Sequence, residues 1–302
     1  MKTKSFSIRA TIIFLAPVAV HAASQIAQWD FDGSYAASNG NFAYDLTPGG
    51  AVALVPSPWG TAAEFHGGTY PITDAATYSN VNLDRLDTTI TRTSASFNGG
   101  FSIMGWVKPY SISDPIGSVL ALDSSSFSLN SLGFALVVDS TVELAVRDTS
   151  DHRAIATASG TPIAAGNWYH IAATWGGSTS DSFALYINGE AVATDVEDLG
   201  GFGGLNGSIS LPIRVGGNLG DSLQNVASFN GAIDHLALFD GVLTPADVGA
   251  AYAGSVPESS TAIFGAAGVL ATHLTIRWLL QTRAHNGTKT VNGEERDQMA
   301  SG

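Results

Sequence analysis

Three acidic residues are the side chains in this sequence best placed to bind a metal ion. Asp30 and Asp32 alternate with aromatic residues at 28–33, so a strand there would put both carboxylates on one face. Asp234 lies in a short apolar strand expected at 232–239. If the first and last strands pair, the three carboxylates come together, and such crowding requires a cation or a raised pKa. Ca²⁺ is the expected cation, because it accepts about six to eight oxygen ligands. Alternatively, Asp30 and Asp32 lie on a solvated face and Asp234 hydrogen-bonds a turn.

Aromatic side chains form the second candidate site, since their faces stack on sugar rings beside hydrogen-bonding polar groups. The aromatic residues expected in or next to loops, and therefore the candidate ligand contacts, are Trp59, Tyr70, Tyr78 and Tyr110. The tryptophans expected in the core are Trp29, Trp106, Trp168 and Trp175. For each loop aromatic residue the alternative is ordinary packing within its own loop.

The residue pattern gives little support for catalysis, and no catalytic residues are assigned. A glycoside hydrolase needs two carboxylates about 5 to 9 Å apart, whereas the acidic group at 195–198 stands in what reads as a loop. His170 has no accompanying G-x-S-x-G nucleophile motif. It lies in an apolar strand-like run, where a histidine packed in the core is expected.

Short strands separated by turn signals must position these residues. The strand expected at 28–33 puts Trp29 and Phe31 on the face opposite its acids. Further strands are expected at 101–107, 167–175 and 183–187, and the last of these enters an Asn-Gly hairpin turn. The Gly-, Ser- and Asp-rich stretches 111–131 and 200–207 read as loops.

One short helix is expected near residue 245, ending by about residue 254. Thr244 can cap it, Pro245 suits its first turn and Asp247 occupies the capping-box position. Leu243 can pack against Val248 as a hydrophobic staple.

Four segments, in this order, resemble laminin-G-like domains, which are concanavalin A-like lectin/glucanase jelly rolls. They are FSIMGWVKP at 101–109, WYHIAATW at 168–175, LYING at 185–189 and GAID at 231–234. The resemblance implies an all-β fold, a two-sheet antiparallel jelly-roll sandwich with one short C-terminal helix, as a single domain over 23–254. It also favours calcium, which related domains often carry. It says little about activity, because this fold hosts many functions.

The two ends carry features of export and sorting. Residues 1–22 combine three cations, an apolar run and small residues at the end, as a secretory signal peptide does. Residues 255–283 resemble the PEP-type C-terminal sorting signal of Gram-negative bacteria, which implies an exosortase-type processing peptidase as a partner. Their apolar run at 262–280 is long enough for transient membrane contact as a transmembrane helix. A plain helix packed on the domain is the alternative. The polar tail, 284–302, is expected to be disordered.

Charge narrows the range of partners. The chain has 13 Lys and Arg against 26 Asp and Glu, and residues 23–254 hold six against 22, a formal net charge of −16. So few cations disfavour nucleic acid, whose phosphates require clustered Lys and Arg. There is no cysteine, so burial, hydrogen bonds or a metal must stabilise the fold.

Together these features favour an exported, non-catalytic binding module of a Gram-negative bacterium, located in the cell envelope or outside the cell. The expected partner is an extracellular or cell-envelope polysaccharide or another surface glycan. The first alternative is an extracellular matrix or adhesion protein that binds protein partners. The second is a glycoside hydrolase of the same fold.

Overall fold

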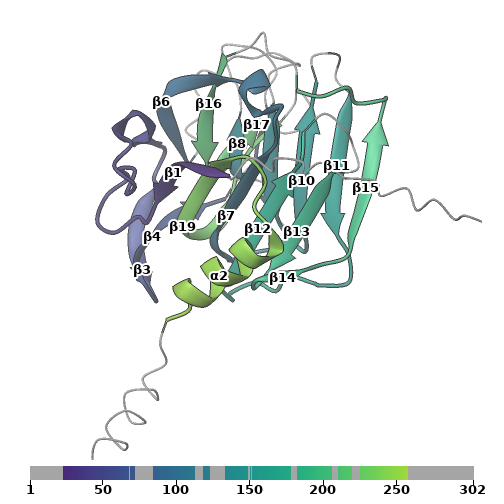
Figure 1. Ribbon diagram of the computed structural model, residues 1–302. Coiled ribbons are helices and arrows are strands. Elements are labelled where there is room, and N and C mark those ends of the chain that lie inside the picture. Colours follow the sequence, from purple (N-terminus) through teal and green to yellow (C-terminus); the bar gives the residue numbers. More distant parts are fainter. Residues whose placement is uncertain are drawn as a thin grey trace, which may run out of the picture. The chain divides into compact units, whose positions relative to one another are not determined.

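Two antiparallel sheets lie face to face in the computed structural model, which describes residues 23–67, 69–71, 84–112, 118–122, 133–148, 150, 152–177, 182–205, 210–219 and 225–257. Figure 1 shows the sheets as two layers, with one helix, α2 (Pro245–Ser255), on the side of the front sheet away from the other. The described chain is therefore the all-β jelly-roll sandwich with one short helix that the sequence predicts.

Each sheet is built from strands far apart in the sequence, as expected for a jelly roll. Sheet A runs β14 (Glu190–Ala191), β13 (Phe183–Ile187), β12 (Tyr169–Trp175), β7 (Phe101–Pro109), β19 (Asn230–Asp240), β4 (Gly60–His66) and β3 (Ala53–Ser57), with β1 (Ser24–Trp29) also paired to β19. Sheet B runs β15 (Thr194–Leu199), β11 (Arg153–Ala158), β10 (Val142–Arg147), β9 (Phe134–Val138), β8 (Ser118–Leu122), β16 (Ser210–Val215), β6 (Arg85–Thr93) and β2 (Leu46–Gly49). A small third sheet joins β17 (Gly217–Leu219), β18 (Asn225–Ser228) and β5 (Thr69–Pro71), and single 3-10 turns form at Phe42–Tyr44 and Ser94–Phe97.

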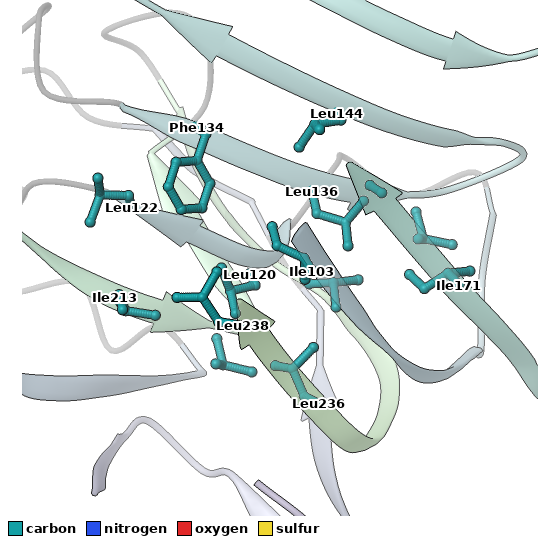
Figure 2. Close-up of a cluster of buried hydrophobic side chains, with 14 of the residues drawn as sticks. Ile103, Leu120, Leu122, Phe134, Leu136, Leu144, Ile171, Ile213, Leu236 and Leu238 are labelled. Atoms are coloured by element: carbon teal, nitrogen blue, oxygen red, sulfur yellow. The ribbon is translucent and has the colours of Figure 1, made fainter. Parts of the chain in front are cut away.

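The inner faces of sheets A and B enclose one apolar core (Figure 2). Ile103 and Ile171 from sheet A lie near Leu136 from sheet B, and all three are fully buried. Phe101 and Phe134 stack across the core with ring centroids 4.2 Å apart. Trp29 and Trp175 are fully buried there as well, which confirms the prediction for those two tryptophans.

The long strand β19 is the centre of sheet A. One of its edges pairs with β7, and the other pairs first with β4 and then with β1. The pairing of β1 with β19 confirms that the first and last strands lie together. Between the stretches that pair with β4 and β1, the register of β19 against β7 shifts between Asp234 and Ala237, and His235 within this bulge has a left-handed φ of 47°. A bulge of this kind redirects side chains at the point where the partner strand changes.

Three expectations about the strands were wrong. The strand expected at 28–33 ends at Trp29, because Phe31 has a left-handed φ of 56° that turns the chain, although Phe31 remains buried. The stretch 111–131 is not all loop, since its apolar run at 118–122 forms the fully buried strand β8. The acidic group at 195–198 lies in the edge strand β15, where most side chains stay exposed and acidic residues are compatible with a strand.

The helix α2 begins as the sequence predicts. Asp247 Oδ2 accepts hydrogen bonds from the Thr244 amide at 2.9 Å and hydroxyl at 2.7 Å, and the Asp247 amide donates to Thr244 Oγ1 at 3.2 Å. Leu243 and Val248 are buried in one small apolar cluster with the outer face of sheet A. The capping box and the staple are therefore both formed.

The chain divides into two compact units, Met1–Gly254 and Ser255–Gly302. In the described part, no helix is both long enough and apolar enough to span a membrane. The predicted signal peptide, the apolar run 262–280 and the polar tail lie outside the described residues.

Candidate ligand-binding face

Aromatic side chains gather on the outer face of sheet A, beside α2. Residues of β7 alternate between the two faces, so that Ile103 and Val107 enter the core while Met104 and Trp106 face outward. The small apolar cluster under α2 covers one part of this outer face. Next to it lie the residues that we call the outer-face cluster: Trp59, Trp106, Trp168, His170 and Tyr252.

Trp59 is at the centre of the outer-face cluster. Its ring lies 4.4 Å from that of Trp106, tilted by 37°, and 5.3 Å from that of Trp168 in an edge-to-face arrangement at 86°. Trp106 is buried beneath, whereas Trp59 and Trp168 are only half-buried. The cluster therefore presents two tryptophan rings, nearly perpendicular to each other, at the surface.

Trp59 is carried by the tight turn between β3 and β4. Ser57 pairs with Gly60, which leaves Pro58 and Trp59 as the two turn residues. Gly60 has a φ of 138°, and a Cβ atom at this position would overlap the Asp32 carboxylate. A glycine is therefore required for both the backbone conformation and the close approach of Asp32.

Asp234 lies under this turn and has no solvent exposure. Its Oδ2 accepts a hydrogen bond from Ser57 Oγ at 2.6 Å, and its Oδ1 accepts from the His235 amide at 2.8 Å and contacts His235 Nδ1 at 2.9 Å. The hydrogen bond with Asp234 raises the pKa of His235, and the negative charges of Asp30 and Asp32 add to this effect against burial, which lowers it. Asp30, Asp32 and Asp234 therefore all act electrostatically on His235.

These acids are engaged with protein donors. Asp30 Oδ1 accepts from Gln28 Nε2 at 2.6 Å, and Asp32 Oδ1 accepts from the Thr61 amide at 3.1 Å. Among the described residues, no group of three or more His, Cys, Asp and Glu is arranged to hold a metal ion. The calcium site stays a prediction that metal analysis of the purified protein would decide.

His170 is buried, as the sequence predicts, but it faces away from the main core. It contacts Trp106 and Tyr252 at ring distances of 5.4 and 5.7 Å. Its Nδ1 has no hydrogen-bond partner among the described residues, and burial lowers the pKa of His170 to about 4. The imidazole is therefore neutral near pH 7 and acts as an apolar support for the outer-face cluster.

Of the other candidate ligand contacts, Tyr110 makes its contacts outside the outer-face cluster. Tyr110 is 40% exposed, and its hydroxyl donates to Glu64 Oε1 at 2.8 Å. Burial, followed by that hydrogen bond, raises the pKa of Tyr110 to about 12, so the phenol stays protonated. Tyr70 lies in the short strand β5 rather than in a loop, because its backbone pairs with Val226. Tyr78 lies outside the described residues.

Two tryptophans assigned to the core take part in the outer-face cluster instead. Trp168 precedes β12 and is half-buried, so the expectation that it is a core residue was wrong. Trp106 is buried, but under Trp59 and not between the sheets. The alternation of side chains along each strand could place both tryptophans on the face of sheet A opposite Ile171. It gives no sign that α2 covers this outer face only in part.

Comparison with known proteins supports the fold. A model of the concanavalin A-like lectin/glucanases superfamily matches residues 83–249, more than half of the chain. No curated protein matches the chain.

Solved structures with a similar fold include carbohydrate- and protein-bound domains. Domain 4 of an extracellular arabinanase from Geobacillus stearothermophilus, solved in complex with arabinotriose, is 18% identical with a TM-score of 0.51 and covers 76% of this chain and 98% of its own. The binding domain of botulinum neurotoxin DC, solved in complex with rat synaptotagmin II, is 14% identical with a TM-score of 0.52 and covers 76% of this chain and 51% of its own. The chain thus spans about half of that toxin domain, and identities this low establish the fold alone.

Proposed function

The chain belongs to the concanavalin A-like lectin/glucanases superfamily, and we propose that it is a non-catalytic module that binds polysaccharide through the outer-face cluster. The half-buried pair Trp59 and Trp168 carries this proposal. Aromatic rings that keep one face toward solvent stack on sugar rings, and neighbouring polar groups fix the orientation of the sugar. His235 is a polar group beside the pair, since its ring lies 6.0 Å from that of Trp59.

The ring geometry favours a single soluble chain as the ligand. Rings at 86° to each other cannot both lie flat on a planar crystalline surface. They can contact two sides of one sugar chain, or two successive sugars of a chain that twists. We therefore propose a soluble polysaccharide.

Charge favours a neutral polysaccharide. The domain carries a formal net charge of −16, and two acids, Asp234 and Asp32, accept hydrogen bonds from the hairpin that carries Trp59. Uronic acid polymers would be repelled by this surface, most strongly at low ionic strength.

Export is part of the proposal. The motif at 1–22 supports secretion, and the segment at 255–283 supports processing by an exosortase-type peptidase in a Gram-negative cell envelope. Polysaccharides outside the cell would then be the accessible ligands.

The test is affinity electrophoresis of the full chain in gels that contain arabinan, laminarin or xylan, with alginate as the anionic comparison. We expect retardation by at least one neutral polymer, and Trp59→Ala and Trp168→Ala should each weaken binding about tenfold, which corresponds to about 1.4 kcal/mol. Phe42→Ala is the matched control, because Phe42 is 75% exposed and lies outside the cluster. Equal retardation of all four proteins would contradict the proposed site.

The same polysaccharides also test two alternative functions, those of a glycoside hydrolase and of an adhesion protein. Release of reducing sugar from any polymer, abolished by substitution of a carboxylate, would support a glycoside hydrolase. Absence of binding to every polymer, together with capture of a purified matrix protein, would support an adhesion protein.

A further inference from the structure

We infer that Asp234 and Asp32 are positioning residues that hold the Trp59 turn in the geometry needed to bind ligand. This inference rests on the proposed function, because it assigns the residues that prepare the same site. Both acids were expected to bind calcium, whereas their contacts point to the turn between β3 and β4. Neither carboxylate needs to touch the sugar for this role.

Asp234 acts on the first half of the turn through a short chain of hydrogen bonds. Ser57 Oγ donates to Asp234 Oδ2 at 2.6 Å and accepts from the Trp59 amide at 3.2 Å. The carboxylate therefore fixes the Ser57 hydroxyl, and the hydroxyl fixes the backbone of Trp59. Hydrogen bonds to a buried charged group are among the stronger ones in proteins.

Asp32 acts on the second half of the same turn. Its Oδ1 accepts from the Thr61 amide at 3.1 Å and would lie only 2.0 Å from a Cβ atom at residue 60. Thr61 is held further, because its hydroxyl donates to the Phe31 carbonyl and accepts from the Gly33 amide at 3.0 Å. The segment after β1 is thus attached to the strand that follows Trp59.

The two carboxylates come from segments near opposite ends of the domain's sequence, and both hold the same two-residue turn. Asp234 is supplied by the bulge of β19, and Asp32 by the left-handed turn after β1. A buried carboxylate could satisfy its hydrogen bonds in many ways that leave Trp59 unconstrained. Here the Ser57 hydroxyl connects the carboxylate to the backbone of Trp59. Removing this hydroxyl therefore tests the connection directly.

The experiment removes that hydroxyl. In Ser57→Ala the hydrogen bond from the Trp59 amide to Ser57 Oγ is lost while both acids remain, so the variant should fold even if Asp234→Asn does not. The control is Ser96→Ala, whose hydroxyl makes one hydrogen bond, to the Thr93 carbonyl, away from the cluster. Ser57→Thr keeps a hydroxyl at the position and should restore the wild-type behaviour.

Two properties are measured for each variant. Tryptophan rings 4.4 Å apart couple their electronic transitions, so Trp59 and Trp106 should give a paired circular dichroism band that Trp59→Ala removes. Affinity for the best neutral polysaccharide is the second readout. We expect Ser57→Ala to weaken the paired band and reduce affinity about tenfold, and Ser57→Thr and Ser96→Ala to keep both.

The outcomes separate the two proposals. If Ser57→Ala keeps the wild-type band and affinity, or loses the band without loss of affinity, the positioning role is wrong even where Trp59→Ala abolishes binding. If Trp59→Ala leaves polysaccharide affinity unchanged, the proposed function is wrong, while loss of the band in Ser57→Ala would still support the hydrogen-bond chain to Trp59.

Discussion

His170 should make the domain less stable in mild acid, and the size of the effect follows from its burial. The residue is 3% exposed, and its pKa is lowered to about 4 from 6.5. Because the folded protein resists protonation, the unfolded chain takes up the proton first as pH falls. Stability linked to His170 is complete above about pH 6.5 and is lost as pH falls toward 4. The difference between the pKa of His170 in the unfolded and folded states lowers the free energy of unfolding by roughly 2 kcal/mol at pH 5 and about 3 kcal/mol at pH 4.

The perturbation that isolates this effect is His170→Phe. A phenyl ring has a similar size, keeps contact with Trp106 and Tyr252, and removes a titrating group whose Nδ1 has no partner in the described part of the chain. Urea unfolding at pH 7 and pH 5 gives the free energy of unfolding for both proteins. We expect the variant to lose roughly 2 kcal/mol less than the wild type between these pH values, since the other titrating groups are common to both. Equal losses would refute the assignment of a low pKa to His170.

Two further predictions concern backbone positions near the site. Thr244→Ala removes the cap of α2 and should lower the free energy of unfolding by about 1 kcal/mol, whereas Thr244→Ser should keep most of that stability. Urea unfolding measures both variants. An alanine variant as stable as the wild type would contradict the role of the capping box. Gly60→Ala should destabilise the domain by about 1 kcal/mol or more beyond Gly40→Ala, because both glycines have positive φ but only Gly60 faces a carboxylate. Equal melting temperatures for these two variants would show that Asp32 does not approach the turn so closely.

Local chemistry made much of the fold predictable. The Asn188-Gly189 turn has φ values of 52° and 81°, as a two-residue hairpin turn requires, and the cap at Thr244 forms as expected. The strand β8 was missed because its apolar run is short and stands in a Ser- and Asp-rich stretch. Turn and cap signals are local, whereas the assignment of β8 depends on burial that only its neighbours in sheet B provide.

The candidate site was predictable only in part. Trp59 could be found from its position in a Pro-Trp-Gly turn, and Asp234 from the strand that closes the sandwich. Trp168 could not, since β12 is apolar on both faces and the partial cover of the outer face by α2 is a tertiary feature. The pairing of the first and last strands could be predicted, but not the hydrogen bonds from Ser57 and Thr61 that engage Asp234 and Asp32.

The most direct test of the outer-face site is a crystal structure of the domain with an oligosaccharide cut from the best-binding polysaccharide, with arabinotriose as the first probe. We predict density for sugar against the rings of Trp59 and Trp168, with the Trp59 turn unchanged. Sugar bound on the outer face of sheet B, or at the edge of the sandwich with both tryptophan rings uncovered, would contradict it.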